Sequence, residues 1–254
     1  MSIADPLLTV QGISKAFAGR RVVTDLALEV RAGEIVGLVG ANGGGKTTTL
    51  RILAGLVTPD TGHGSVLGLD LRLKARQIRA RAGYMPQGKS FYPSLTVREN
   101  LRFRAAAFCV PNAKQAVSQL VDTYGLRRFE DTRAESLSGG WARLLQLAGA
   151  LIHSPPLLYL DEPTAGLDIA NRHWVWEHIG ALARSGVAVI LSTHDLVEAE
   201  RCGRLTLLAE GVTLASGTPA EVIAGASAAT LEAATLALLQ RQRSSADSWQ
   251  RIAS

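Results

Sequence analysis

Gly40-Ala41-Asn42-Gly43-Gly44-Gly45-Lys46-Thr47-Thr48 is the stretch that decides the fold. It follows residues 34–39, whose apolar run predicts a buried strand, and it precedes residues 50–54, whose apolar content predicts a helix. A strand, a glycine-rich loop and a helix in this order form a loop that cradles phosphates. Because glycines carry no side chains, backbone N–H groups can turn toward a polyphosphate, and the helix adds its positive N-terminal end.

Individual residues of this loop have separate expected roles. Lys46 is expected to reach the outer phosphates as a point charge, and the Thr47 hydroxyl is expected to bind Mg²⁺. A glycine-rich turn that binds nothing is the alternative, but the complete G-x-x-x-x-G-K-T pattern in its expected setting favours the phosphate loop. The remaining residues expected to line it are Gly40, Asn42, Gly43, Gly44, Gly45 and Thr48.

The composition is that of a globular protein. The 254 residues suffice for one sizeable domain or two small ones, with 47% hydrophobic and 19% charged residues. No apolar run approaches the length that spans a bilayer, and the N-terminus lacks a signal-peptide pattern, so we expect a cytoplasmic protein. Cys109 and Cys202 lie far apart without metal-ligand spacing, which predicts two reduced thiols in packed positions.

The net charge is +5, because 27 Lys and Arg residues outnumber 22 acids. Much of the excess lies in short groups at residues 72–81 and 241–243, which favours solvated helix faces. Aromatic residues are not interleaved with these groups, so stacking on nucleic-acid bases is not indicated. A phosphate-rich ligand or an anionic membrane surface would suit the same charge.

The sequence around the loop predicts an α/β protein with added segments. Residues 7–17 and 22–30 alternate as antiparallel strands joined by a turn at 18–20, and short strands are expected at 64–67 and 82–85. Thr96 with Glu99 is a capping-box signature, and Pro111 begins a second helical segment that runs to about residue 123. Residues of about 88–137 therefore form a helical insertion in a single domain spanning 1–225.

The C-terminal part is expected to add a helix and a tail. The alanine-rich residues 224–237 predict a terminal helix, and the polar residues 241–254 are expected to fray. We therefore assign residues 226–254 to a C-terminal helix and polar tail outside the main domain.

Two further strands are apolar on both faces, as central parallel strands are. Residues 157–160 end in Asp161-Glu162, and residues 187–191 end in Ser192-Thr193-His194; helices are expected at 138–151 and 169–184. In a doubly wound sheet, functional groups gather at the carboxyl ends of the strands. The end groups of these strands are therefore expected to meet at the phosphate loop.

This position gives each end group a candidate role. Asp161 is placed to hold Mg²⁺ through water, and Glu162 to orient the water that attacks a γ-phosphate. His194 is expected to contact the γ-phosphate or that water. Alone, His194 would more often be a structural histidine and the acidic pair a solvated turn, but their joint position favours the catalytic interpretation.

With Leu137-Ser138-Gly139-Gly140, the chain resembles the ATP-binding subunit of an ABC transporter. The phosphate loop, the 157–162 run, Asp168 in residues 165–168, Gln87 and His194 occur in that family's order and cover nearly the whole chain. The resemblance implies a P-loop NTPase core with a mainly parallel sheet, an N-terminal antiparallel β subdomain and an α-helical insertion. It also implies ATP hydrolysis with ATP and Mg²⁺ bound.

The resemblance further implies that Ser138, Gly139 and Gly140 bind the γ-phosphate of ATP held by a partner subunit. A glycine-flanked serine at a helix N-terminus suits an anion, but in this fold it would lie too far from its own phosphate loop. Two cassettes, in a homodimer or a heterodimer, are then expected to pair head to tail around two ATP molecules.

Other residues receive roles from the same resemblance. Phe17 would stack on adenine, although a core phenylalanine is the commoner meaning of such a residue. Gln87 would contact the metal and link the nucleotide to the membrane partner, residues 91–108 would lie near the groove for that partner, and Asp168 would lie across the dimer interface. A core position remains the alternative for Phe103 and Phe108.

Three residues depart from the common family pattern: Trp141 replaces a glutamine, and Gly44 and Gly166 replace other small residues. Trp141 would pack on the partner's nucleotide or fill the interface. Trp141 with the 161–166 motif resembles a branch that exports drugs, lipids or glycans.

The expected function is thus ATP hydrolysis that drives a separate membrane-spanning permease from the cytoplasmic face of the membrane, with no nucleic acid bound. The alternatives are an importer subunit, a soluble ABC ATPase acting on ribosomes or DNA, and a nucleotide-binding module without turnover. The presence of Glu162 and His194 argues against the last of these.

Overall fold

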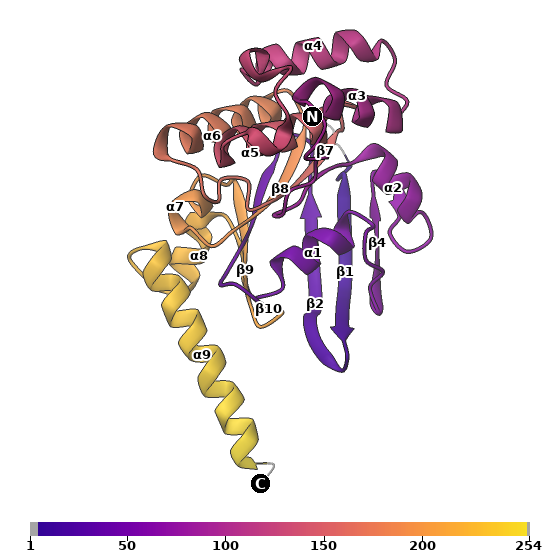
Figure 1. The fold of residues 1–254 in the computed structure, drawn as a ribbon. Coiled ribbons are helices and arrows are strands. Elements are labelled where there is room, and N and C mark those ends of the chain that lie inside the picture. The colour runs from indigo at the N-terminus through magenta and orange to yellow at the C-terminus, as the bar shows by residue number, and fades with distance from the viewer. Residues whose placement is uncertain (1–4, 253–254) are drawn as a thin grey trace.

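One ten-stranded sheet organises the protein in the computed structural model, which describes residues 5–252 (Figure 1). The strand order is β5-β4-β1-β2-β10-β9-β3-β8-β7-β6. The strands are β1 (Leu8–Phe17), β2 (Arg20–Val30), β3 (Ile35–Val39), β4 (Thr61–Val66), β5 (Leu69–Asp70), β6 (Gly83–Met85), β7 (Leu157–Asp161), β8 (Ala188–Thr193), β9 (Arg204–Ala209) and β10 (Val212–Gly217).

The half of the sheet that carries the site is parallel. Strands β9, β3, β8, β7 and β6 pair in parallel, with Val39 opposite Thr193 and Asp161 opposite Ser192. Alternate residues of β7 face two hydrophobic clusters: Leu158 packs with the helices α5 (Gly139–Leu151) and α6 (Ile169–Arg184), whereas Leu157 packs with α1 (Lys46–Leu53). Because both faces are covered, the strand is apolar throughout, and each buried leucine contributes about 2 kcal/mol.

The antiparallel strands are continuous with this core instead of forming a separate sheet. β1 pairs with β2 and β4 in antiparallel fashion, and β10 joins β2 at the single pair Val212–Thr24. β10 also pairs antiparallel with β9, so it bridges the two halves. The predicted antiparallel part is therefore present, and the sheet remains mainly parallel only on the side of β3.

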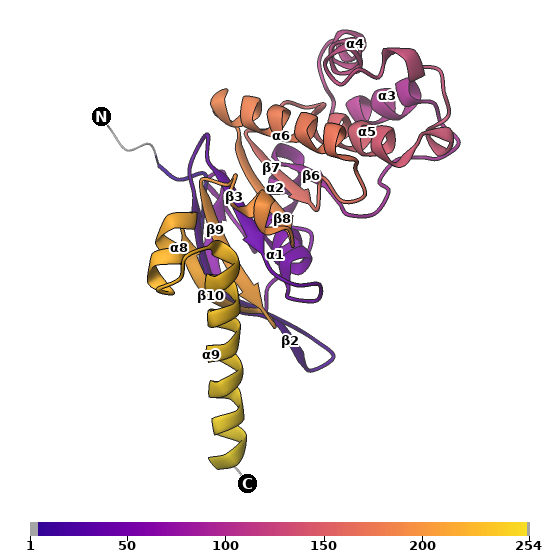
Figure 2. The same cartoon turned by 90° about the vertical axis from the view of Figure 1, so that its left-hand side faces the viewer.

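The helical insertion gathers at one end of the molecule, as Figures 1 and 2 show. Its elements are α3 (Val97–Ala107), α4 (Ala113–Thr123), the 3₁₀ turns η1 (Arg127–Phe129) and η2 (Ala134–Ser136), and the start of α5. The predicted capping box is present: Glu99 N donates to Thr96 Oγ1 at 3.1 Å, and Thr96 N donates to Glu99 Oε2 at 2.8 Å.

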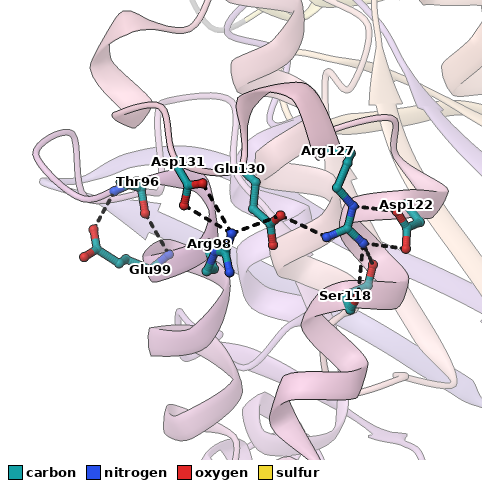
Figure 3. Close-up of polar contacts among 8 residues, drawn as sticks. All are labelled: Thr96, Arg98, Glu99, Ser118, Asp122, Arg127, Glu130 and Asp131. Atoms are coloured by element: carbon teal, nitrogen blue, oxygen red, sulfur yellow. Dashed lines mark hydrogen bonds and ion pairs between the residues drawn. The ribbon is translucent and has the colours of Figure 1, made fainter.

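Ion pairs connect the pieces of this insertion (Figure 3). Arg127, in η1, pairs with Asp122 of α4 at 2.6 Å and with Glu130 at 2.9 Å. Arg98 of α3 reaches the same Glu130 at 3.1 Å and Asp131 at 3.2 Å. The pairs bind two helices and a turn to one another, although solvent limits the free energy of such exposed pairs.

The C-terminal segment differs from its prediction. The alanine-rich stretch is divided between α8 (Pro219–Gly225) and α9 (Leu231–Ile252), which projects away from the sheet (Figure 1). Leu231 and Ala234 anchor the first turn of α9 in a small cluster with Val222. The tail expected to fray is helical through residue 252, since alanine, leucine, glutamine and arginine favour helix; residues 253 and 254 lie outside the described residues.

The two helices not yet placed are α2 (Ala75–Arg81) and α7 (Leu196–Ala199). Within residues 5–252, no helix combines the length and apolar character needed to cross a bilayer.

The cysteine prediction is half wrong. Cys202 is buried, which raises the pKa of its thiol to about 12, but Cys109 is exposed. Cys109 adopts a left-handed backbone (φ 51°) just after α3, which turns the chain at a helix end on the surface instead of in the core.

Candidate functional site

The phosphate loop leaves β3 and closes on α1 with almost no room for side chains. Gly45, the N-cap of α1, has a φ of 98°, and a Cβ there would lie 2.4 Å from the carbonyl oxygen of Val22. A Cβ on Gly40 would lie 2.1 Å from the carbonyl oxygen of Leu208. Glycine is therefore required where the loop packs against β2 and β9, and these two strands support the loop.

The loop opens onto a cleft of about 210 Å³. It is lined by Val22, Asn42, Gly43, Gly44, Gly45, Lys46, Thr47, Thr48, Gln87 and Glu162. Most of the predicted phosphate-binding residues therefore share one concave surface with the predicted catalytic glutamate, whereas Gly40 does not line it.

Lys46 is the main cation of the cleft. Its Nζ donates to the carbonyl oxygens of Gly40 (2.7 Å) and Ala41 (3.0 Å), and its side chain is buried. Burial lowers the pKa of Lys46, while Glu162 and Asp161 oppose that shift. Carbonyl oxygens compensate the ammonium only in part, so this lysine is ready to take anionic oxygens as partners.

Asp161 ends β7 beneath the loop and is fully buried. Its Oδ1 accepts from Thr47 Oγ1 at 3.0 Å and from Ser192 Oγ at 2.7 Å, whereas its buried Oδ2 has no hydrogen-bond partner among the described residues. An unpartnered carboxylate oxygen beside a threonine hydroxyl fits a hard divalent cation.

The donor set also fits one particular cation. Residues 5–252 contain no group of three or more histidine, cysteine or acidic side chains that could hold a metal on its own. Mg²⁺ is usually held by one or two carboxylates together with substrate phosphates, which matches the single carboxylate here.

Glu162 carries its carboxylate on a strained backbone. Its φ of 49° lies in the left-handed region, and its N–H donates to Ser192 Oγ at 2.9 Å. Its Oε2 accepts from Gln87 Nε2 at 3.0 Å, and its Oε1 lies 3.5 Å from His194 Nδ1. Non-glycine residues in this region cluster at functional sites, where neighbouring contacts hold them. The structure thus brings Gln87, Glu162 and His194 together. With Lys46, these are the side chains for which the sequence predicted a catalytic role.

Sequence reasoning missed the residues that hold the Gln87 loop. Arg143 Nη1 donates to the carbonyl oxygen of Pro86 at 3.2 Å, and Gln146 Nε2 donates to that of Gly88 at 2.6 Å. Burial lowers the pKa of Arg143, against the attraction of Glu162 and Asp161. The sequence signal that could have found them is their spacing: Arg143 and Gln146 are two polar residues about one turn apart in the otherwise apolar helix α5.

The Ser138–Gly140 segment lies outside the cleft, on the helical insertion. Ser138 is the N-cap of α5, yet its hydroxyl makes no capping bond, and a Cβ on Gly139 would meet nothing within 4 Å. None of Ser138, Gly139 and Gly140 lines the cleft. The segment is therefore not part of the site formed by the chain's own phosphate loop.

Trp141 packs on its own chain. Its ring centroid is 4.8 Å from that of Phe129, and the Arg128 guanidinium lies 4.4 Å from the Trp141 ring. The tryptophan is half-buried in this cluster, so part of its surface stays accessible beside Gly140.

Asp168 begins α6 instead of lining the cleft. Its Oδ1 accepts from Asn171 N at 2.9 Å and its Oδ2 from Asn171 Nδ2 at 2.6 Å; these hydrogen bonds lower the pKa of the carboxyl. The next residue, Ile169, is 89% exposed, which places a large apolar side chain in solvent directly after Asp168.

Phe17 is not a core residue, because its side chain is 48% exposed at the end of β1. An exposed aromatic ring leaves stacking on a purine open, whereas the core alternative is excluded. Phe103, for which a core position was the alternative, is 49% exposed and packs edge-on against Tyr92, with ring centroids 4.7 Å apart.

A second concave surface lies between α2, α3 and the end of α5. This groove has a volume of about 350 Å³, and its mainly apolar lining includes Leu56, Tyr84, Arg104, Phe108 and His153. The Phe108 and His153 rings stack with centroids 3.9 Å apart. The predicted segment 91–108 therefore contributes one wall of a groove.

Comparison with known proteins agrees with these motifs. Residues 23–165 match the family model described as ABC transporter. Nod factor export ATP-binding protein I of Bradyrhizobium diazoefficiens is 40% identical over 226 residues, which are 88% of this chain and 74% of that protein. Probable multidrug ABC transporter ATP-binding protein YbhF of Escherichia coli is 36% identical over 217 residues, 85% of this chain and 38% of that protein.

A solved structure described as the ATP binding subunit of an ABC transporter superposes with a TM-score of 0.84. It is 31% identical, and the match covers 92% of this chain and 99% of that one.

Proposed function

The chain belongs to the ABC transporter family, and we propose that it is the ATP-hydrolysing subunit of an exporter, driving a separate membrane-spanning permease. The observation that carries the proposal is that Lys46, Thr47 and Glu162 line one cleft, with the buried Asp161 hydrogen-bonded to Thr47. The export direction is supported by the relatives, which are named for Nod factor export and as a probable multidrug transporter subunit.

ATP binding follows from the cleft. The backbone N–H groups of the phosphate loop receive the phosphates, and Lys46 exchanges its two carbonyl acceptors for phosphate oxygens. The exposed ring of Phe17 offers adenine a stacking surface.

Mg²⁺ fits the unpartnered Oδ2 of Asp161 together with the Thr47 hydroxyl, and Gln87 is the third candidate ligand. When bound, the ion would neutralise charge on the phosphates.

In this proposal, hydrolysis depends on Glu162, which lines the cleft, and on His194 beside it. Glu162 orients the attacking water and accepts its proton, since Glu162 lines the same cleft as the phosphate loop. His194, 3.5 Å from Glu162 and 57% exposed, contacts the γ-phosphate or that water. Gln87 is hydrogen-bonded to Glu162. It thereby connects Glu162 and His194 to the chain segment that leads into the groove between α2, α3 and α5.

A second cassette completes the reaction centre in this proposal. Ser138, Gly139 and Gly140 lie at the start of α5, where an anion is favoured, but none of them lines the cleft of their own chain. Two large apolar side chains near the site are also exposed, Ile169 at 89% and Val197 at 68%. Such side chains suit an interface that closes over ATP with Asp168 across it.

The permease would dock in the groove beside residues 91–108. An apolar groove with a few polar groups suits an amphipathic helix of a partner. The chain would then act at the cytoplasmic face of the membrane, held there by the permease. No nucleic-acid partner is proposed.

Affinity purification of the tagged chain from detergent-solubilised membranes tests this function. We expect a polytopic membrane protein to co-purify and to stimulate ATP hydrolysis. Co-purification of ribosomes or DNA would favour a soluble ABC ATPase instead. Uptake into inverted vesicles reconstituted with the permease distinguishes export from import, because in that orientation an exporter fills the vesicle and an importer empties it.

A further inference from the structure

Glu198 is a buried carboxylate that does not line the phosphate-loop cleft. It lies in α7 with only 4% of its surface exposed. Its Oε1 accepts from Thr164 Oγ1 at 2.5 Å, and its Oε2 accepts from Thr193 Oγ1 at 2.8 Å. Removing a carboxylate from water is unfavourable unless its oxygens are satisfied, and here two hydroxyl groups satisfy them.

The two donors come from the two segments that carry the catalytic side chains. Thr164 follows Glu162 by two residues in the loop after β7, and Thr193 is the last residue of β8, directly before His194. Both threonines are 3% exposed. One carboxylate therefore connects the backbone beside Glu162 to the backbone beside His194.

The position of Glu198 is itself fixed from α6 and from the α7 cap. Asp195 Oδ1 accepts from Val197 N at 2.9 Å, which holds the first turn of α7. Asp195 Oδ2 accepts from Arg172 Nη1 at 2.7 Å, and Arg172 Nε lies 3.7 Å from Glu198 Oε1. The carboxylate thus belongs to a network between α6 and α7 and is not a freely rotating side chain.

The loop that Glu198 holds includes a strained residue. Glu162 has a left-handed φ of 49°, a conformation that persists only where neighbouring contacts impose it. Ser192 holds its N–H at 2.9 Å, and Thr164 restrains the chain two residues further on. Releasing Thr164 would let the loop relax, and the 3.5 Å separation of Glu162 and His194 would change with it.

We propose that Glu198 is a positioning residue for ATP hydrolysis, which holds Glu162 and His194 in register through Thr164 and Thr193. The inference rests on the proposed ATPase function. It does not place Glu198 against the nucleotide, since Glu198 does not line the cleft. A displacement of about 1 Å at the reacting groups can lower a rate by about a hundredfold, whereas phosphate binding tolerates it.

Steady-state ATPase assays of the full chain test the proposal, with ATP affinity measured in parallel. We expect Glu198→Ala to lower kcat about tenfold or more while KM for ATP stays within about twofold. Glu198→Gln should regain part of the rate, because its amide oxygen still accepts one hydroxyl. The control is Glu200→Ala, which removes an exposed carboxylate just after the same helix.

Double variants separate positioning from general destabilisation. If Glu198 acts through the threonines, Thr164→Val and Thr193→Val each lower kcat at unchanged KM, and either combined with Glu198→Ala adds little further loss. Should Glu198→Ala not fold, the two valine variants decide alone, since valine keeps the threonine volume.

The inference would be overturned if the valine variants kept the wild-type kcat. It would also be overturned if KM rose and the melting temperature fell together, without a selective loss of kcat. A wild-type chain no more active than Lys46→Ala would instead refute the proposed function, and the inference with it.

Discussion

The two anion-facing regions of the molecule are built in opposite ways. At the strand ends, Asp161 and Glu162 are buried, and the Ser192 hydroxyl is hydrogen-bonded to both of them. At the start of α5, Ser138 and Gly139 are exposed; the Ser138 hydroxyl makes no capping bond, and a Cβ on Gly139 would meet nothing within 4 Å. The difference teaches that one half of the proposed reaction centre is organised by contacts within the chain, whereas the other half is left exposed.

The largest effect should come from the enclosed region. We expect Glu162→Gln to lower kcat by about a thousandfold, because the amide still accepts a hydrogen bond but no longer accepts a proton from water. ATP affinity should persist, and size-exclusion chromatography with ATP should show a trapped dimer. Lys46→Ala is the contrasting variant, since it should weaken ATP binding itself; hydrolysis by Glu162→Gln at the wild-type rate would reject the role of Glu162.

The next prediction tests the open region. Gly139→Asp places a negative charge where the partner's phosphate is proposed to bind, and the open space around Gly139 lets the chain fold. We expect turnover to fall about tenfold to a hundredfold at an unchanged ATP affinity of the single chain, as electrostatic stabilisation is lost.

Gly225→Asp is the matched control, because a Cβ there also meets nothing within 4 Å and the residue ends α8, away from the cleft. If ATP-dependent dimerisation and turnover of Gly139→Asp equal those of this control, the serine-glycine segment is not an anion site.

Trp141 lies at the border of the open region and should show a smaller, mixed effect. Trp141→Ala removes its contacts with Phe129 and Arg128, which should lower the free energy of unfolding by about 1–2 kcal/mol, as measured by urea denaturation. We also expect ATP-dependent dimerisation to weaken by several-fold. Unchanged dimerisation with lower stability would make Trp141 a packing residue of its own insertion only.

The smallest effect concerns the cap of α6. Hydrogen bonds from Asn171 lower the pKa of Asp168, so the stabilisation is present above the unfolded pKa and is lost as pH falls through the folded pKa. Asp168→Ala should therefore lower the melting temperature at pH 7 and differ less from wild type at pH 3. A difference independent of pH would contradict the assignment to the ionised carboxylate.

Local sequence patterns predicted the phosphate loop, the strands of the parallel core and the polar residues at the ends of those strands. Each of these depends on neighbouring residues: glycines that admit the backbone, an apolar run, and an acid directly after it. The family match and the superposed structure confirm the predicted fold and the predicted family.

Long-range contacts were beyond the same reasoning. Arg143 and Gln146 contact a loop more than fifty residues away, and Glu198 joins the loop after β7 to the end of β8. No local periodicity encodes such partners. The surface position of Cys109 depends on how α3 ends. The helical continuation through residue 252 depends on the anchoring of α9 in its small hydrophobic cluster.

The backbone at residue 162 implies that thermal robustness and chemistry favour different amino acids there. Glycine adopts a left-handed φ without strain, so Glu162→Gly would relieve the loop while deleting its carboxylate. A laboratory selection for heat resistance alone would tend to erase the glutamate, and a selection for turnover would restore it.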